Sequence, residues 1–301
     1  MEKRARRTMM FAPANNPKML VTAHLYGADC ILFDLEDAVK YADKDAARDL
    51  LAEALKVVDY GKTEIFARIN PLNTEFGKDD VKILVPAGLR NMRLAMCEKP
   101  EQVKELDELL TEIERENNIE IGTCKIQCSL ETPLAIMNAV SIATASPRVV
   151  SISFGAEDFT RTMGATRTKD GKELFVARSM VVMAAAVAGV DAIDTVWSNL
   201  EDEEGFKEEV KTAMELGFAG KSCIHPSQIG IVHKIFTPSR EEVEKSLEIV
   251  KAAKAADISR GGVITVKGKM VDIPVIAKAE KVVRLAKSAG MIKEQEAEKN
   301  D

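Results

Sequence analysis

Eight short apolar runs with β-strand character alternate along this chain with longer segments of helical periodicity. A run, a helix and a second run form a βαβ unit, so the repetition predicts a parallel sheet. An open dinucleotide-binding sheet would need a glycine-rich loop after its first strand, and the sequence there, FAPANNP, is not one. We therefore predict an α/β fold, a closed (β/α)8 TIM barrel. The runs occupy residues 7–13, 30–37, 64–70, 88–96, 125–132, 149–158, 191–198 and 219–226.

The chain continues beyond the eighth run for longer than a barrel requires. SREEVEKSLEIVKAAKAAD and VIAKAEKVVRLAKSAG have helical patterns, and the glycine-punctuated segment RGGVITVKGKMVDIP between them is typical of a loop or hairpin. We predict a catalytic barrel domain over residues 1–238 and a C-terminal helical and loop extension over residues 239–301.

Composition and charge are typical of a globular protein without nucleic-acid or membrane partners. With 46% hydrophobic and 30% charged residues, the chain has the composition of a soluble globular protein with a large core. The formal net charge of -6 gives no electrostatic reason to expect nucleic-acid binding. The basic start MEKRARR lacks the apolar run of a signal peptide, and no later stretch could span a bilayer, so we expect a cytoplasmic protein without a membrane partner. The five cysteines form no CxxC pair and are expected to be buried, reduced thiols.

Polar residues close several of the apolar runs. In a TIM barrel the C-terminal ends of the strands meet at one mouth, where active sites form. Acids that converge there would repel one another and would lose hydration on burial. A divalent cation removes this cost, and carboxylate oxygens without a histidine or thiol cluster favour Mg²⁺ or Mn²⁺ over zinc. The candidates at these ends are Asp34, Glu36, Asp37, Arg68, Asn70, Glu131, Thr132, Glu157 and Asp158.

Each of these acids also has a simpler explanation as a helix N-cap or first-turn residue, because acids favour helix N-termini. For Glu131, Asp158 and Arg68 together that explanation is weaker, since three different strands end in the same unusual way. Arg68 beside a metal ion would bind a substrate carboxylate with its planar guanidinium. Among the histidines, His225 ends the eighth run and could face the mouth, whereas the other two fall in helical patterns.

Motifs at most of the strand ends occur in an order that resembles a known family. They are RTMMFAPANNPKM, ILFDLEDAV, ARIN, LETPLAI, SFGAEDFTR, IDTVWS, FAGKSCIHPSQI and GKMVDIPVI, and they cover nearly the whole chain. In this order they resemble the HpcH/HpaI aldolase and citrate lyase-like superfamily, and within it the citrate lyase β subunits. The resemblance implies a Mg²⁺-dependent TIM-barrel lyase that cleaves citryl thioester, on an acyl carrier protein or coenzyme A, to acetyl thioester and oxaloacetate.

The resemblance also implies roles for individual residues. The glutamate of LETPLAI makes Glu131 a metal ligand within the substrate site, and the aspartate of GAEDF makes Asp158 the other ligand. The arginine of ARIN makes Arg68 the catalytic residue that binds the substrate carboxylate. In DLEDAV, Asp37, with Glu36 beside it, would orient metal-bound water.

The aspartate of GKMVDIP makes Asp272 the catalytic acid/base. In related lyases the C-terminal segment that carries this residue reaches over the barrel of a neighbouring subunit, so the resemblance implies a homo-oligomer in which residues 239–301 cap the partner. One position departs from the family pattern. Where relatives often have a proline-lysine pair after arginine-leucine, this chain has Ala95 and Met96 after Arg93 and Leu94, so the resemblance does not extend to the thioester or substrate pocket there.

The leading hypothesis is a citrate lyase β subunit that works with an α acyltransferase subunit and an acyl carrier protein γ subunit. A close alternative is a stand-alone lyase or synthase for malyl, methylmalyl or citramalyl thioesters, which Glu131, Asp158 and Arg68 would serve equally well. An alternative of another class is a non-catalytic scaffold subunit. Retention of both metal ligands, the arginine and Asp272 argues against the scaffold.

Overall fold

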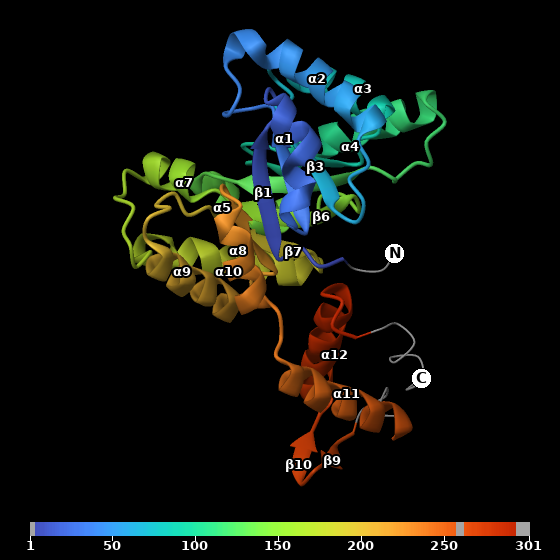
Figure 1. Ribbon diagram of the computed structural model, residues 1–301, viewed down its shortest axis with the longest axis vertical. Coiled ribbons are helices and arrows are strands. Elements are labelled where there is room, and N and C mark those ends of the chain that lie inside the picture. Colours follow the sequence, from blue (N-terminus) through green and yellow to red (C-terminus); the bar gives the residue numbers. More distant parts are fainter. Residues whose placement is uncertain (1–3, 257–261, 293–301) are drawn as a thin grey trace. The chain divides into compact units, whose positions relative to one another are not determined.

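The structure, a computed structural model, describes residues 4–256 and 262–292 (Figure 1). It divides into two compact units. One comprises Arg6–His233, and the other comprises the remaining described residues, 4–5, 234–256 and 262–292. Part of the predicted C-terminal extension, residues 257–261 and 293–301, lies outside the described residues.

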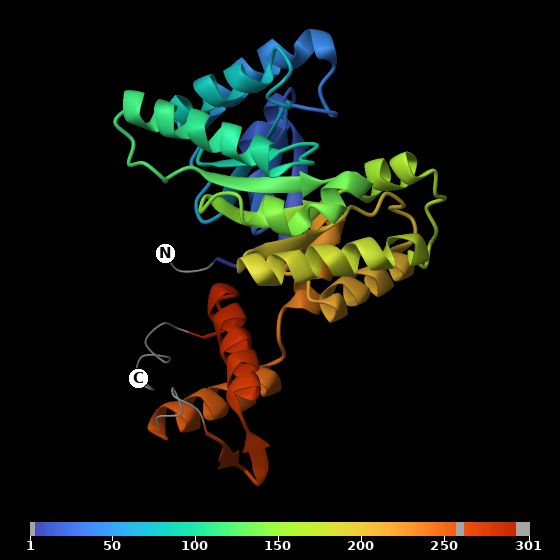
Figure 2. The same cartoon turned by 180° about the vertical axis from the view of Figure 1, so that it is seen from behind.

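The larger unit contains a closed barrel of eight parallel strands in sequential order, as the alternating pattern predicted. Each strand pairs with the next, and pairing of the first strand with the last closes the barrel. Figures 1 and 2 show helices on the outside of these strands. The strands are β1 (Thr8–Pro13), β2 (Cys30–Asp34), β3 (Glu64–Ile69), β4 (Asn91–Leu94), β5 (Lys125–Leu130), β6 (Val149–Phe154), β7 (Asp191–Asp194) and β8 (Gly220–Cys223).

The helices of this unit form because apolar residues recur at helical spacing. In α4 (Pro100–Glu116), Val103, Leu106, Leu110 and Ile113 lie on one stripe, and all four are buried. The other helices are α1 (Pro17–Thr22), η1 (Ala23–Tyr26), η2 (Tyr41–Asp43), α2 (Lys44–Val57), α3 (Gly77–Ala87), α5 (Pro133–Met137), α6 (Ala139–Ala143), α7 (Ala156–Met163), η3 (Lys172–Leu174), α8 (Phe175–Ala188), α9 (Glu203–Leu216) and α10 (Ser227–Phe236), which begins in this unit and ends in the second.

The sixth strand is shorter than the sequence predicted. It ends at Phe154, Gly155 caps the next helix, and Glu157 and Asp158 lie in the first turn of α7. The reason is physical, because the helix N-terminus carries a partial positive charge that favours acidic side chains. The two acids therefore follow the strand, at the same end of the barrel, on the opening turn of a helix.

A buried apolar cluster lies inside the barrel. Met9, Cys30, Leu32, Phe66 and Ile193 form a buried cluster, and the partly buried ring of Phe11 packs against it. Side chains two residues apart on a strand face the same side, so this ring lies one layer nearer the C-terminal ends than Met9. All five cysteines lie in the described part of the chain and are buried and free, as predicted.

Ion pairs connect the N-terminal ends of the strands. Arg6 contacts Glu64 (2.7 Å) and Asp191 (2.9 Å). His233 lies 3.0 Å from the Thr8 hydroxyl, so it packs against the barrel, as its place in a helical pattern suggested. This end of a TIM barrel contributes to stability, and the chemistry is expected at the opposite end.

The second unit contains two helices, α11 (Arg240–Ala255) and α12 (Ile273–Ser288), which pack against each other, and a hairpin. The strands β9 (Ile264–Val266) and β10 (Lys269–Val271) are antiparallel, and their two-residue turn has Lys267 (φ 50°) and Gly268 (φ 75°) in the left-handed region that such turns require. No helix within residues 4–256 and 262–292 is long and apolar enough to cross a membrane.

Candidate active site

A cavity of about 460 Å³ opens at the C-terminal ends of the barrel strands. Several residues that the sequence singled out line it together, although they come from different βα units. The lining residues are Phe11, Pro13, Asp34, Asp37, Ala38, Arg68, Arg93, Ser129, Glu131, Phe154, Gly155, Ala156, Glu157, Asp158, Thr195, Val196, Ser222 and Ile224.

Glu131, directly after β5, is a buried acid of the cavity with an unused oxygen. Its side chain is 4% exposed, and its buried Oε1 has no hydrogen-bond partner within the described residues. Gly155 provides the space, because a Cβ there would lie 2.7 Å from Glu131 Cγ and 3.1 Å from Oε2. A buried carboxylate oxygen without a donor is costly, so this arrangement is suited to a bound cation.

Asp158 approaches the cavity from the first turn of α7. Its Oδ1 accepts a hydrogen bond of 2.5 Å from the exposed Arg161, and its side chain is 27% exposed and lines the cavity. The start of the helix is held by Thr195 after β7, whose hydroxyl accepts a hydrogen bond from Ala156 N at 3.1 Å. The position of Asp158 is thus set by neighbouring strands rather than by a free loop.

The donor set fits a hard divalent cation. Glu131 and Asp158 offer carboxylate oxygens, and no group of three or more His, Cys, Asp or Glu side chains within the described residues could hold a metal by itself. Mg²⁺ is commonly bound through one or two carboxylates and keeps several waters or substrate oxygens in its coordination shell. Two carboxylates at an open cavity therefore match Mg²⁺ better than a closed zinc site.

Arg68 lies at the end of β3, where it is held by protein carboxylates. Its Nε and Nη2 donate to the two oxygens of Asp34 at 2.7 and 2.6 Å, because the parallel register places these residues side by side. Its Nη1 contacts Glu36 at 2.8 Å and Asp37 at 3.1 Å. Burial works against the charge, but the Asp34 hydrogen bonds and the three carboxylates raise the pKa of Arg68, so it remains a cation.

Glu36 has an unusual titration for a carboxylic acid. Burial raises its pKa to about 7, the charge of Arg68 opposes this effect, and the nearby Asp37 and Glu131 add to it. The carboxyl group therefore exchanges its proton near neutral pH. Perturbed carboxyl groups of this kind concentrate at functional sites, although Glu36 is not among the described residues that line the cavity.

Arg93 is a site residue that the sequence analysis passed over as part of an atypical motif. It is 3% exposed, lines the cavity and donates from Nε to Ser153 Oγ at 3.1 Å. The Phe11 ring centroid lies 5.2 Å from its Cζ and 5.3 Å from Cζ of Arg68. Arg93 could have been predicted from strand pairing, because Arg68 and Arg93 are register partners on β3 and β4 and therefore face the same side of the sheet.

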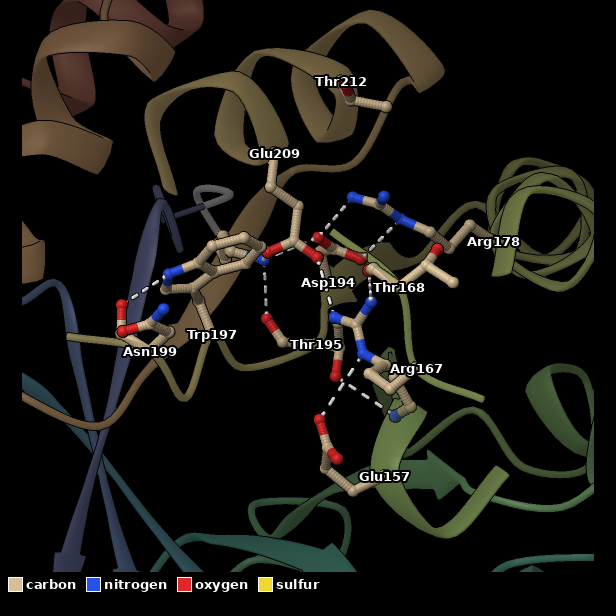
Figure 3. A network of polar contacts seen from close by, with 12 residues as sticks. Glu157, Arg167, Thr168, Arg178, Asp194, Thr195, Trp197, Asn199, Glu209 and Thr212 are labelled. Atoms are coloured by element: carbon tan, nitrogen blue, oxygen red, sulfur yellow. Dashed lines mark hydrogen bonds and ion pairs between the residues drawn. The ribbon is translucent and has the colours of Figure 1, made fainter. Parts of the chain in front are cut away.

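A buried polar network supports the neighbouring part of the barrel (Figure 3). Asp194 at the end of β7 accepts from Arg178 at 2.7 and 3.0 Å and from the fully buried Lys221 at 2.9 Å. Lys221 also contacts Glu209 at 3.0 Å and donates to the Thr195 carbonyl at 2.9 Å. The network therefore holds the residue that fixes the start of α7.

Two further candidates lie elsewhere. His225 is not one of the described residues that line the cavity; it is exposed, and its Nδ1 lies 2.8 Å from the Ser227 hydroxyl. Asp272 belongs to the second unit, where it caps α12 by accepting from Val275 N at 3.2 Å. Its role as acid/base stays a prediction, as do the roles of the cavity residues.

The chain is similar to known proteins over nearly its whole length. Residues 7–226 match the HpcH/HpaI aldolase/citrate lyase family. A protein named citrate lyase subunit beta from Leuconostoc mesenteroides subsp. cremoris is 44% identical over 290 residues, which cover 96% of each chain. The structure is similar to that of CitE from Mycobacterium tuberculosis in complex with magnesium, acetoacetate and coenzyme A (TM-score 0.72, 31% identity, 94% of this chain and 98% of that one). It is also similar to a citrate lyase beta subunit from that organism complexed with oxaloacetate and magnesium (TM-score 0.66, 31% identity, 78% and 98%).

Proposed function

The chain belongs to the HpcH/HpaI aldolase/citrate lyase family, and from this premise we propose that it is the β subunit of a citrate lyase. It is a carbon-carbon lyase that cleaves citryl thioester to acetyl thioester and oxaloacetate with Mg²⁺. The observation that carries this proposal is the cavity at the barrel mouth. There Glu131, with its unpartnered oxygen, and Asp158 share one space with two arginine side chains. An anionic substrate and a divalent cation both have complementary groups in this cavity.

The reaction removes a proton from the tertiary hydroxyl, breaks the adjacent carbon-carbon bond and leaves a thioester enolate, which is then protonated on carbon. Glu131 and Asp158 would hold Mg²⁺, which when bound would supply Lewis-acid stabilisation of the negative charge that develops on oxygen. Arg68 binds the carboxylate next to the hydroxyl-bearing carbon, since its guanidinium lines the cavity and is anchored by Asp34.

Asp37 and Glu36 position water and the guanidinium group of Arg68, whose Nη1 they contact at 3.1 and 2.8 Å. Asp272, as the acid/base, takes the proton of the tertiary hydroxyl and returns it to the enolate carbon, so that the step needs no other proton donor. As the resemblance to the family implies, the protein works as a homo-oligomer in which the segment that carries Asp272 completes the site of another subunit. The partners are an acyltransferase subunit and an acyl carrier protein, and the complex is cytoplasmic.

The proposal is tested by incubating purified protein with citryl thioester on coenzyme A and on a carrier protein, with and without Mg²⁺, and by measuring released oxaloacetate. We expect Mg²⁺-dependent oxaloacetate from the wild type. Glu131→Gln should lose at least about 100-fold in rate, because a metal ligand is replaced by a neutral amide. Pyruvate or glyoxylate from other thioesters, without oxaloacetate from citryl thioester, would contradict the substrate. Silence on every thioester would favour a scaffold subunit.

A further inference from the structure

Arg93 is a cation of the cavity that forms no ion pair with a carboxylate among the described residues, although Glu131, Asp34 and Glu36 lie near enough to favour its charge. The neighbouring Arg68 contacts three carboxylates. Within the described part of the chain, Arg93 makes one side-chain hydrogen bond, from its Nε to the neutral hydroxyl of Ser153. A guanidinium has five N–H donors, so most of the donors of Arg93 remain for a ligand. With 3% of the residue exposed and the cavity as its open side, the ligand must enter from the cavity.

The environment of Arg93 is prepared for an anion. Burial, and then the nearby charge of Arg68, lower the pKa of Arg93 to about 10. The protonated guanidinium is therefore less stable here than in water, and a bound anion would stabilise it. At neutral pH the side chain is still protonated. A carboxylate placed against it would gain a charge-assisted, two-point hydrogen bond in a site largely shielded from water.

Arg68 and Arg93 present two adjacent guanidinium groups on one wall of the cavity. They are register partners on neighbouring strands, and the same Phe11 ring lies 5.3 Å from one Cζ and 5.2 Å from the other. The shared ring supports both guanidinium groups by cation-π contact. Two positions side by side suit a small molecule with two carboxylates better than one with a single carboxylate.

The candidate substrates differ in this property. Citryl thioester yields oxaloacetate, which has two carboxylates, whereas citramalyl and malyl thioesters yield pyruvate and glyoxylate, which have one. We propose that Arg93 is a specificity-determining residue that binds the second carboxylate of the citryl group and of oxaloacetate. Arg68 binds the carboxylate that all these substrates share. The inference rests on the proposed function and deepens it, since it names the side chain that distinguishes its substrate from the alternatives.

The test compares kcat/KM for citryl and citramalyl thioesters of coenzyme A in the wild type and in Arg93→Met, a substitution of similar length. A hydrogen bond to a charged group contributes about a 10- to 100-fold effect, so we expect citryl cleavage to fall by about 100-fold in kcat/KM. Citramalyl cleavage should change by less than about threefold, because its methyl group makes no charged contact. Arg93→Lys should restore part of the citryl rate. An equal loss on both substrates, or no loss on citryl thioester, would overturn the proposal.

Two controls separate this inference from the proposed function. Arg90→Met removes an arginine next to the same strand whose Nη1 donates to the carbonyls of Val85 and Leu89, and it should leave the ratio of the two rates unchanged. Calorimetric binding of oxaloacetate and pyruvate in the presence of Mg²⁺ needs no turnover. If no thioester is cleaved, the proposed function fails. Even then, the wild type should bind oxaloacetate more tightly than pyruvate, and Arg93→Met should remove this difference. Equal weakening for both acids, or no preference in the wild type, would overturn the role of Arg93.

Discussion

Gly155→Ala tests whether Glu131 must occupy its observed position. The backbone at residue 155 (φ -105°, ψ 94°) suits any L-amino acid, so the substitution introduces no backbone strain. The obstacle is the Glu131 side chain, because the new Cβ would lie 2.7 Å from its Cγ and 3.1 Å from its Cδ. The change therefore displaces Glu131 without altering its chemistry.

The size of the effect follows from the contact. Carbon atoms pack at about 3.5–4.0 Å, so Glu131 must move by about 1 Å. A shift of that size at a catalytic group costs about 100-fold in rate, and we expect a comparable weakening of Mg²⁺ binding. Overpacking costs about 1–3 kcal/mol of stability, which lowers the Tm of a domain of this size by about 2 to 10 °C.

The assay measures Mg²⁺ affinity by calorimetry, lyase rate at saturating Mg²⁺ and Tm by circular dichroism. Gly230→Ala is the matched control, because Gly230 lies in α10 with no atom within 4 Å of the added Cβ. It should raise stability by about 0.5–1 kcal/mol and leave Mg²⁺ binding unchanged. Normal Mg²⁺ affinity and normal turnover in Gly155→Ala would refute the assignment of Glu131 as a metal ligand held in place by this contact.

Three further predictions address other parts of the molecule. Asp272→Asn should fold and bind Mg²⁺ but lose most lyase activity, and near-normal turnover would remove its assigned role. Because the pKa of Glu36 is about 7 in the native state against 4.5 for an ordinary glutamate, its contribution to stability is complete below about pH 4.5 and is lost as the pH rises through about 7. In urea unfolding of the metal-free protein, the free energy of unfolding should fall by on the order of 3 kcal/mol as the pH rises from about 4.5 to above 7. Glu36→Gln should remove this fall, and the same pH dependence in the variant would contradict the prediction. Lys221→Met should reduce the free energy of unfolding by about 3 kcal/mol, against less than about 0.5 kcal/mol for the exposed Lys211→Met, and similar losses in the two variants would show that burial of the pair is unimportant.

The barrel could be predicted because its signals are local. Each apolar run and each amphipathic stripe, such as that of α4, is visible within about 15 residues of sequence. Strand ends were less certain, and the sixth strand is the clearest case. In the sequence, the apolar residues and the following Glu157 and Asp158 form one continuous run. In the structure, the two acids stabilise the N-terminus of a helix that begins at residue 156.

The site was partly visible for a different reason. Polar residues at strand ends must converge in a barrel, so Glu131, Asp158 and Arg68 could be expected to line one cavity, and they do. The contacts among them depend on register and on side-chain volume, which single residues do not reveal. The pairing of β2, β3 and β4 sets these contacts. It places Asp34 where it accepts two hydrogen bonds from Arg68, and it places Arg93 beside Arg68.

The most direct test of the account is a crystal structure of the protein with Mn²⁺ and oxaloacetate, in which anomalous scattering locates the metal. We predict Mn²⁺ bound to carboxylate oxygens of Glu131 and Asp158, with one oxaloacetate carboxylate against Arg68 and the other against Arg93. Metal at another place, or oxaloacetate outside the cavity, would contradict the central claim that this barrel mouth is a lyase site for a dicarboxylic 2-oxo acid.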